Sequence, residues 1–200
     1  MYATVEGIDG VGKSFFLEKV RASSSIVVIL DDDLDGEALE VIRQLKKEDS
    51  FFRDVDPVEV FDAFTYVDDL IYEAKVLPAL NEGKIVLQDR GADTTCVYAA
   101  IELEKKGEGH FRENYNTLMM QRKKLGPVPE RVFLLVDEFD KCIERAEKRN
   151  ARKFTSDEKE FLRKVDEEFR LIAEDNPQRF TVIDVSKDDV VKEILAVLSP

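Results

Sequence analysis

The sequence has few of the residues that build metal clusters, disulfides or membrane spans. Two cysteines, one histidine and no tryptophan occur among its 200 residues. Cys96 and Cys142 match no metal-ligand spacing, and His110 has no second histidine with which to share an ion. No stretch approaches the roughly 20 apolar residues of a membrane helix, and the start of the chain lacks the basic and apolar runs of a signal peptide. We therefore expect a cytoplasmic protein with no membrane association.

Positive charge is also scarce. The formal net charge is −13, from 43 acidic and 30 basic residues. Binding to nucleic-acid polymers depends on a basic surface, so this balance argues against such a partner. The charge is uneven, however, because acids gather in 31–62 and bases in 141–153. A small anionic ligand is therefore still compatible with the composition, provided that a few cations surround it.

The remaining composition is that of one globular domain. Hydrophobic residues make up 44 % of the chain, and no linker or repeat divides it, so we treat 1–200 as a single domain. The expected strands are Tyr2–Val5, Ile26–Leu30, Ile85–Leu87, Val132–Val136 and Phe180–Val185. The expected helices cover 12–22, 36–47, 57–82, 92–105, 109–124, 138–150 and 156–175. This alternation predicts a three-layer α/β domain with a parallel sheet between helices.

The strongest motif is a glycine-rich loop between the first strand and the first helix. It reads Gly7-Ile8-Asp9-Gly10-Val11-Gly12-Lys13-Ser14, a complete GxxxxGK[ST] pattern. Glycines allow the backbone to curl so that successive N–H groups point at phosphate oxygens, and the helix N-terminus adds positive charge. In this pattern Lys13 reaches the β- and γ-phosphates, and the Ser14 hydroxyl ligates Mg²⁺. The loop therefore predicts binding of a nucleoside triphosphate, ATP or GTP, with Mg²⁺.

Several segments, in order along nearly the whole chain, resemble the thymidylate kinase family. Glu6–Ser14 is similar to the family's opening (E/G)G(I/L)DG(S/A)GK(S/T), and Asp89-Arg90 stands where the family has Asp-Arg-Tyr/His. Thr94 and Tyr98 match the serine and tyrosine that follow in DRYxxSxxAYQ. Further resemblance lies in Leu77–Val86, Val132–Asp137, Ile143–Arg145 and Arg179–Ser186.

The resemblance implies a P-loop fold with strand order 2-3-1-4-5, a homodimer, and transfer of the γ-phosphate of ATP to a nucleoside monophosphate, dTMP or a related one. In this interpretation Asp89 orders Mg²⁺ with Ser14, and Arg90 holds the acceptor phosphate. A lid at about 141–155 supplies arginines to the transferring phosphate. The implied catalytic residues are Lys13, Asp89, Arg90, Arg145, Arg149 and Arg152. The implied substrate-binding residues are Asp9, Phe64, Asp68, Arg90, Thr94 and Tyr98.

The acceptor side departs from the family's pattern. Where the family's second strand ends in Arg-Glu-Pro, this chain has Leu30 followed by Asp31, Asp32 and Asp33, whose carboxylates would repel a phosphate. The family also has Phe-x-x-x-Arg on its long helix, where the arginine meets the O4 of thymine. Phe64 takes the first position and Asp68 the second. An ionised Asp68 accepts hydrogen bonds and cannot donate one, so it suits a base with an amino group. The alternative is that Asp68 is a solvated acid on the surface of the helix.

Three interpretations follow. The first is a thymidylate kinase, or a close monophosphate kinase, with a rebuilt acceptor pocket. The second is a deoxynucleoside kinase that uses Asp31, Asp32 or Asp33 as the general base on a 5′-hydroxyl, with Arg90 nearby. The third is a regulator that binds ATP without transferring phosphate. Lys13, Ser14, Asp89 and the lid arginines favour the enzymes, because a pure binder has no need of a lid that neutralises a transition state.

Overall fold

The sheet of the protein has the predicted parallel topology. The computed structural model describes residues 1–30, 33, 35–45, 49 and 51–198. Its strands are β1 (Tyr2–Glu6), β2 (Val27–Ile29), β3 (Val86–Asp89), β4 (Arg131–Val136) and β5 (Phe180–Asp184). They form one sheet in the order β2-β3-β1-β4-β5, and every pair is parallel. The expected α/β fold and its strand order are confirmed.

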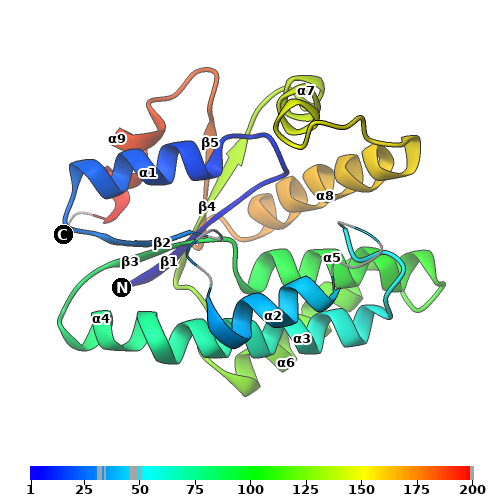
Figure 1. The fold of residues 1–200 in the computed structure, drawn as a ribbon, viewed down its shortest axis with the longest axis horizontal. Coiled ribbons are helices and arrows are strands. Elements are labelled where there is room, and N and C mark those ends of the chain that lie inside the picture. The colour runs from blue at the N-terminus through cyan, green and yellow to red at the C-terminus, as the bar shows by residue number, and fades with distance from the viewer. Residues whose placement is uncertain (31–32, 34, 46–48, 50, 199–200) are drawn as a thin grey trace.

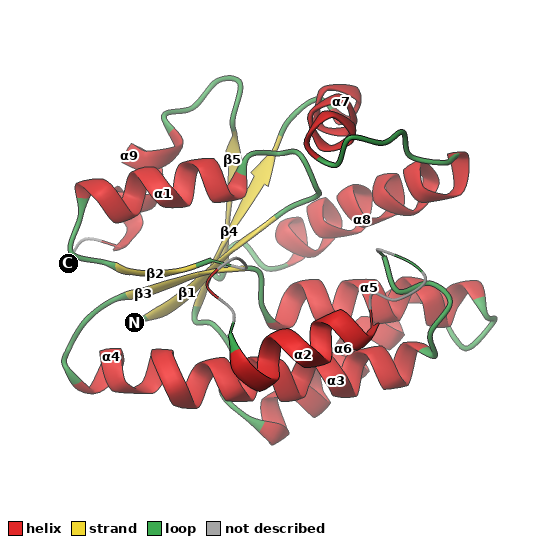
Figure 2. Cartoon of the chain, viewed as in Figure 1, coloured by secondary structure: helices red, strands yellow, loops and turns green. Residues whose placement is uncertain are grey.

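Helices cover both faces of this sheet. They are α1 (Lys13–Ser23), α2 (Gly36–Leu45), α3 (Pro57–Ile71), α4 (Leu77–Asn81), α5 (Ala92–Lys105), α6 (Phe111–Leu125), α7 (Phe139–Arg149), α8 (Ser156–Asp175) and α9 (Val190–Leu198). Figure 1 shows α1 and α9 on one side of the sheet and α3 to α6 on the other, and Figure 2 shows the layers by element type. Among the helices of the described residues, α9 alone was not expected from the sequence. Within the described part of the chain, no helix has both the length and the apolar content to cross a membrane.

The long helix expected at 57–82 begins and ends where predicted but is not uniform. Asp56 caps its start, because the Asp56 side chain accepts a hydrogen bond from the Val58 amide. A π-helical turn at Tyr72–Val76 separates α3 from α4. Pro78 lies in the first turn of α4 and has no amide hydrogen, so the regular hydrogen-bond ladder cannot continue through it.

The register of the central strands places the glycine-rich loop beside the end of β3. Val5 of β1 pairs with Asp89 of β3, so the two strands end together at the carboxyl edge of the sheet. Both strands are buried along their whole length, which fixes this edge rigidly in the core. Open α/β sheets bind ligands outside the carboxyl ends of their strands, and the candidate site lies there.

Candidate active site

The glycine-rich loop adopts a conformation that only glycine tolerates at two positions. Gly7 has φ 134° and Gly10 has φ 81°. A β-carbon at Gly7 would lie 2.6 Å from the carbonyl oxygen of Leu135, and one at Gly10 only 1.9 Å from that of Cys142. The loop is therefore held between β1, β4 and α7. Lys13 Nζ folds back over it and donates to the carbonyl oxygens of Gly7 at 3.0 Å and Ile8 at 3.2 Å.

Ser14 and Asp89 form a polar pair at the mouth of the loop. The Ser14 hydroxyl donates to Asp89 Oδ2 at 3.1 Å. The other carboxylate oxygen, Asp89 Oδ1, is buried and has no hydrogen-bond partner among the described residues. A hydroxyl beside a carboxylate with an unused oxygen fits Mg²⁺, which takes one or two protein oxygens and completes its shell with phosphates and water. These two side chains are the candidate magnesium ligands.

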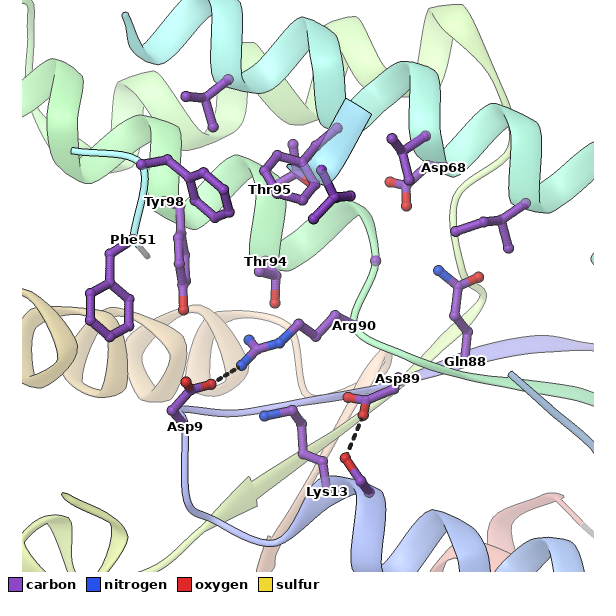
Figure 3. Close-up of a pocket in the computed structure, with 18 of the residues that line it drawn as sticks. Asp9, Lys13, Phe51, Asp68, Gln88, Asp89, Arg90, Thr94, Thr95 and Tyr98 are labelled. Atoms are coloured by element: carbon purple, nitrogen blue, oxygen red, sulfur yellow. Dashed lines mark hydrogen bonds and ion pairs between the residues drawn. The ribbon is translucent and has the colours of Figure 1, made fainter. Parts of the chain in front are cut away.

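The loop residue Asp9 pairs with two of the arginines predicted from the sequence, Arg90 and Arg149. Its Oδ1 accepts from Arg90 at 2.5 Å, and its Oδ2 accepts from Arg149 of α7 at 3.2 Å. Arg90 follows β3 in the left-handed region, with φ 60°. Such a backbone conformation is uncommon for a residue with a side chain, and it turns the guanidinium toward the loop (Figure 3). Strain of this kind is concentrated at functional sites.

The three arginines expected in the lid do not share one position. Arg145 of α7 pairs with Asp137 at 2.7 Å and donates to the Gly10 carbonyl oxygen at 3.3 Å, so it lies against the loop. Arg149 also reaches the loop, through Asp9. Arg152 points to the N-terminus of α8, where Glu158 accepts two hydrogen bonds from it, at 2.7 and 2.9 Å. The structure therefore brings Arg145 and Arg149 to the loop and does not bring Arg152 there.

One cavity of about 340 Å³ connects the loop to the predicted acceptor side. Most of the predicted site residues line it, namely Asp9, Lys13, Ser14, Phe64, Asp68, Asp89, Arg90, Thr94, Tyr98 and Arg149. Figure 3 shows Tyr98, Thr94 and Arg90 around its centre, with Asp68 and Gln88 together at one end. Burial raises the pKa of Tyr98 to about 12, so its hydroxyl stays protonated at neutral pH.

The Asp68 side chain has a cationic partner on another helix. Asp68 Oδ2 lies 3.8 Å from Nε of Arg122, and Asp69 Oδ1 lies 3.0 Å from Nη2 of the same guanidinium. The Arg122 side chain comes from α6 and is only 2 % exposed, while that of Asp68 is 11 % exposed. Asp68 lines the cavity and Asp69 does not. Asp68 is thus a largely buried acid held in an ion pair, not a solvated residue of the helix surface.

The wall formed by α5 is fixed by a buried network. Asp93 accepts two hydrogen bonds from Arg179, at 2.7 and 2.6 Å, and one from the Tyr115 hydroxyl at 2.7 Å. Next to it, Thr94 donates to Glu6, the last residue of β1. Burial raises the pKa of Glu6 well above its usual range, and the Asp93 carboxylate adds to the rise. These bonds hold α5 against β1, β5 and α6, and so position Arg90 and Thr94.

Of the three aspartates considered as a general base, only Asp33 lies within the described residues; Asp31 and Asp32 do not. Asp33 accepts a hydrogen bond from the Leu30 amide at 3.0 Å and forms an ion pair with Arg21 of α1. The Arg21 guanidinium and the Leu30 amide lower the pKa of Asp33 despite partial desolvation. The Asp33 carboxylate therefore stabilises the end of β2 and is not among the residues that line the cavity.

Some cavity residues were not assigned to the site from the sequence. The Phe51-Phe52 pair was open between a core anchor and a part of the acceptor pocket; both residues line the cavity, and Phe52 packs edge-on against Phe64 with ring centroids 5.0 Å apart. Gln88, in the middle of the core-facing strand β3, also lines it and is only 4 % exposed. A polar residue inside a buried strand is itself a signal, because such groups need a partner. Arg122 carried no such signal, because its link to Asp68 exists only in three dimensions.

Comparison with known proteins gives one consistent result. The sequence model of the thymidylate kinase family matches residues 5–194. A probable thymidylate kinase from Methanosarcina barkeri is 33 % identical over 98 % of this chain and 96 % of its own length. A thymidylate kinase from Thermoanaerobacter sp. is 27 % identical over 97 % of this chain and 98 % of its own.

Among solved structures, a crystal structure of thymidylate kinase from Ehrlichia chaffeensis has a similar fold. It matches with a TM-score of 0.70 and 22 % identity, over 100 % of this chain and 98 % of that one. At this level of identity the match supports the fold, and the family assignment rests on the sequence comparisons.

Proposed function

This chain belongs to the thymidylate kinase family, and from that premise we propose that it transfers the γ-phosphate of ATP to a nucleoside monophosphate, as its family does with dTMP. The observation that carries the proposal is that Lys13 and Ser14 of the glycine-rich loop line the same cavity as Arg90 and Phe64. A donor phosphate on the loop and an acceptor phosphate at Arg90 would meet there. This arrangement favours an enzyme over a regulator that only binds ATP.

We assign the donor side to the loop and its neighbours. The loop amides and the Lys13 ammonium would hold the β- and γ-phosphates, since this geometry is typical of P-loop proteins. Ser14 and Asp89 would hold Mg²⁺, which, when bound, neutralises charge on the phosphates. Arg145 and Arg149 already contact the loop, through Gly10 and Asp9. A movement of either guanidinium over the loop would place it on the transferring group.

We assign the acceptor phosphate to Arg90, because a guanidinium can bind a phosphate by two parallel hydrogen bonds. In the transfer, an oxygen of the acceptor phosphate attacks the γ-phosphorus while the bond from that phosphorus to the β–γ bridging oxygen breaks. ADP leaves with the electron pair. The chemistry needs little covalent help, so the chain's contribution is to align the two phosphates and balance their charge. Asp9 holds Arg90 before the substrates arrive.

We further propose that segment 141–155 acts as a lid that excludes water, so that ATP is not hydrolysed. Residues 1–200 would act as one domain in the cytoplasm. A homodimer is the assembly that the family resemblance supports. Sedimentation equilibrium would test the dimer, because two chains of 22.9 kDa give about twice that mass.

The experiment that tests the reaction is ADP release from MgATP with a panel of nucleosides and nucleoside monophosphates, dTMP included. We expect turnover with monophosphates and none with nucleosides. The Lys13→Ala variant, examined for intact folding by circular dichroism, is the control for contaminating kinases. Activity with nucleosides alone would replace this proposal with the deoxynucleoside kinase interpretation. Binding of ATP without any turnover would favour the regulator.

A further inference from the structure

The base end of the cavity carries a hydrogen-bond acceptor that the fold keeps in place. The Asp68 carboxylate lines the cavity and forms an ion pair with the buried guanidinium of Arg122. Arg122 is also tied to Asp69, so it bridges α6 and two successive residues of α3. A buried cation that compensates Asp68 removes much of the cost of keeping a carboxylate in a half-buried pocket. The pocket therefore presents a fixed group that accepts hydrogen bonds and does not donate them.

Gln88 supplies a hydrogen-bond donor to the same cavity. The Tyr2 hydroxyl donates to Gln88 Oε1 at 2.9 Å, which occupies the oxygen of the amide. The nitrogen of the same amide then remains for the cavity, which Gln88 lines. Figure 3 shows Asp68 and Gln88 on the side of the cavity away from Asp9 and Lys13, Asp68 on the helix and Gln88 on the strand. A hydrogen-bond acceptor and a donor thus both line the cavity that Phe64 lines, where the acceptor base would lie.

From this pair we infer that Asp68 and Gln88 are specificity-determining residues that read a 4-amino pyrimidine, so that dCMP is an acceptor at least as good as dTMP. The inference rests on the proposed function, because it concerns the base of the monophosphate whose phosphate Arg90 holds. It extends the proposed function from dTMP, after which the family is named, to a second pyrimidine nucleotide, dCMP.

The reason lies in the edges of the two bases. Cytosine presents an amino group that donates, next to a ring nitrogen, N3, that accepts, which complements Asp68 and the Gln88 amide nitrogen. Thymine presents a carbonyl oxygen at the same position, so it offers Asp68 no donor there. The N3–H of thymine could meet the carboxylate, but it lies between two carbonyl oxygens that the negative charge repels. Asp68 therefore favours the amino base.

The test compares kcat/KM for dCMP and dTMP, with saturating MgATP and the full-length protein. We expect a dCMP to dTMP ratio of one or more in the unmodified chain. In Asp68→Asn, whose amide can donate to a carbonyl, we expect the ratio to fall by roughly tenfold or more, mainly through KM. Asp69→Asn is the matched control, because Asp69 pairs with the same Arg122 but does not line the cavity. It should leave the ratio unchanged.

Turnover of dTMP without turnover of dCMP would overturn the inference and leave the proposed function standing. An equal change of the ratio in both variants, or no change in Asp68→Asn, would likewise reduce Asp68 to a structural residue. If Asp68→Asn fails to fold, calorimetric titration of the unmodified protein with dCMP and with dTMP decides the preference, and tighter binding of dTMP overturns it. Failure of every monophosphate to turn over would overturn the proposed function, and the same titrations would still test the base preference.

Discussion

The donor side and the acceptor side of the cavity are built in different ways. The donor side is one continuous segment, Gly7–Ser14, joined by Asp89 from the neighbouring strand. The acceptor side is assembled from the loop at Phe51 and Phe52, from α3, from the middle of β3 and from α5. Its charged residue on α3, Asp68, depends on a partner from a further helix, α6.

This difference explains why one side keeps the family's pattern and the other departs from it. Each donor residue is constrained by the tight turn of the loop and by the backbone packed against it, because a β-carbon at Gly10 would overlap the Cys142 carbonyl oxygen of α7. Residues on separate elements can change one at a time as long as each finds a new partner. The pairs Asp68–Arg122 and Asp33–Arg21 are such solutions.

The largest effect should come from the donor side. We expect Lys13→Ala to lower kcat by about a thousandfold or more, because it removes a cation aimed at the transferring phosphate. Lys19→Ala, on the exposed face of the same helix, should leave kcat unchanged. Steady-state ADP release measures both. Equal losses in the two variants would show that the helix as a whole, and not the loop lysine, matters.

The next largest effect should appear in stability on the acceptor side. Asp93→Asn leaves the guanidinium of Arg179 without its buried counter-charge, so we expect the free energy of unfolding to fall by about 3 kcal/mol. Asp175→Asn breaks an exposed pair with Arg112 and should cost less than about 1 kcal/mol. Urea denaturation measures both. Because α5 carries Thr94 and Tyr98, the KM for the acceptor should rise in Asp93→Asn while the affinity for ATP stays constant.

Arg90→Ala tests whether the two sides separate functionally. We expect transfer to fall by about fiftyfold, which corresponds to about 2.3 kcal/mol, because the acceptor phosphate loses a bidentate partner. The Kd for ATP, measured by calorimetry, should change less than about threefold. An equal loss of ATP affinity would place Arg90 on the donor side. The exposed Arg112→Ala is the control.

The smallest effect concerns Glu6, which lies on the boundary between the two sides. Burial raises the pKa of Glu6 in the folded protein above its ordinary value of 4.5, so the folded state keeps a proton that the unfolded state releases. Above pH 4.5 the unmodified protein therefore loses stability relative to Glu6→Gln as the pH rises toward the folded pKa. The gap should widen by at most about 1.4 kcal/mol per pH unit and become independent of pH below pH 4. Urea denaturation between pH 4 and 8 measures it, and a constant gap would contradict the assignment.

The features that could be predicted from the sequence are those that depend on residues close together in the chain. Apolar runs located all five strands to within two residues at either end, and the loop motif singled out Lys13 and Ser14, which line the cavity. The interruption before Pro78 was not foreseen, although a proline inside a helical segment is a signal of one. The short α9 was missed too.

Contacts between distant elements could not be predicted from one sequence. Spacing on a helix put Arg145, Arg149 and Arg152 on one side, but α7 ends at Arg149, and Arg152 pairs with Glu158 in the first turn of α8 instead. Phe51 was open between a core and a pocket role, and it has both, since it packs against Phe154 and Phe161 and lines the cavity. Arg179, which carried part of the family resemblance, holds Asp93.

The ion pair between Asp68 and Arg122 also limits how this sequence could have diverged. An arginine at position 68 would face the buried guanidinium of Arg122, and two like charges at that distance repel strongly in a half-buried site. A single substitution that restores the family's residue at 68 should therefore be deleterious on its own. The two positions therefore have to change as a pair, so relatives with arginine at the position of Asp68 should lack a cation at the position of Arg122. Such covariation links two helices and cannot be recognised from the sequence of either helix alone.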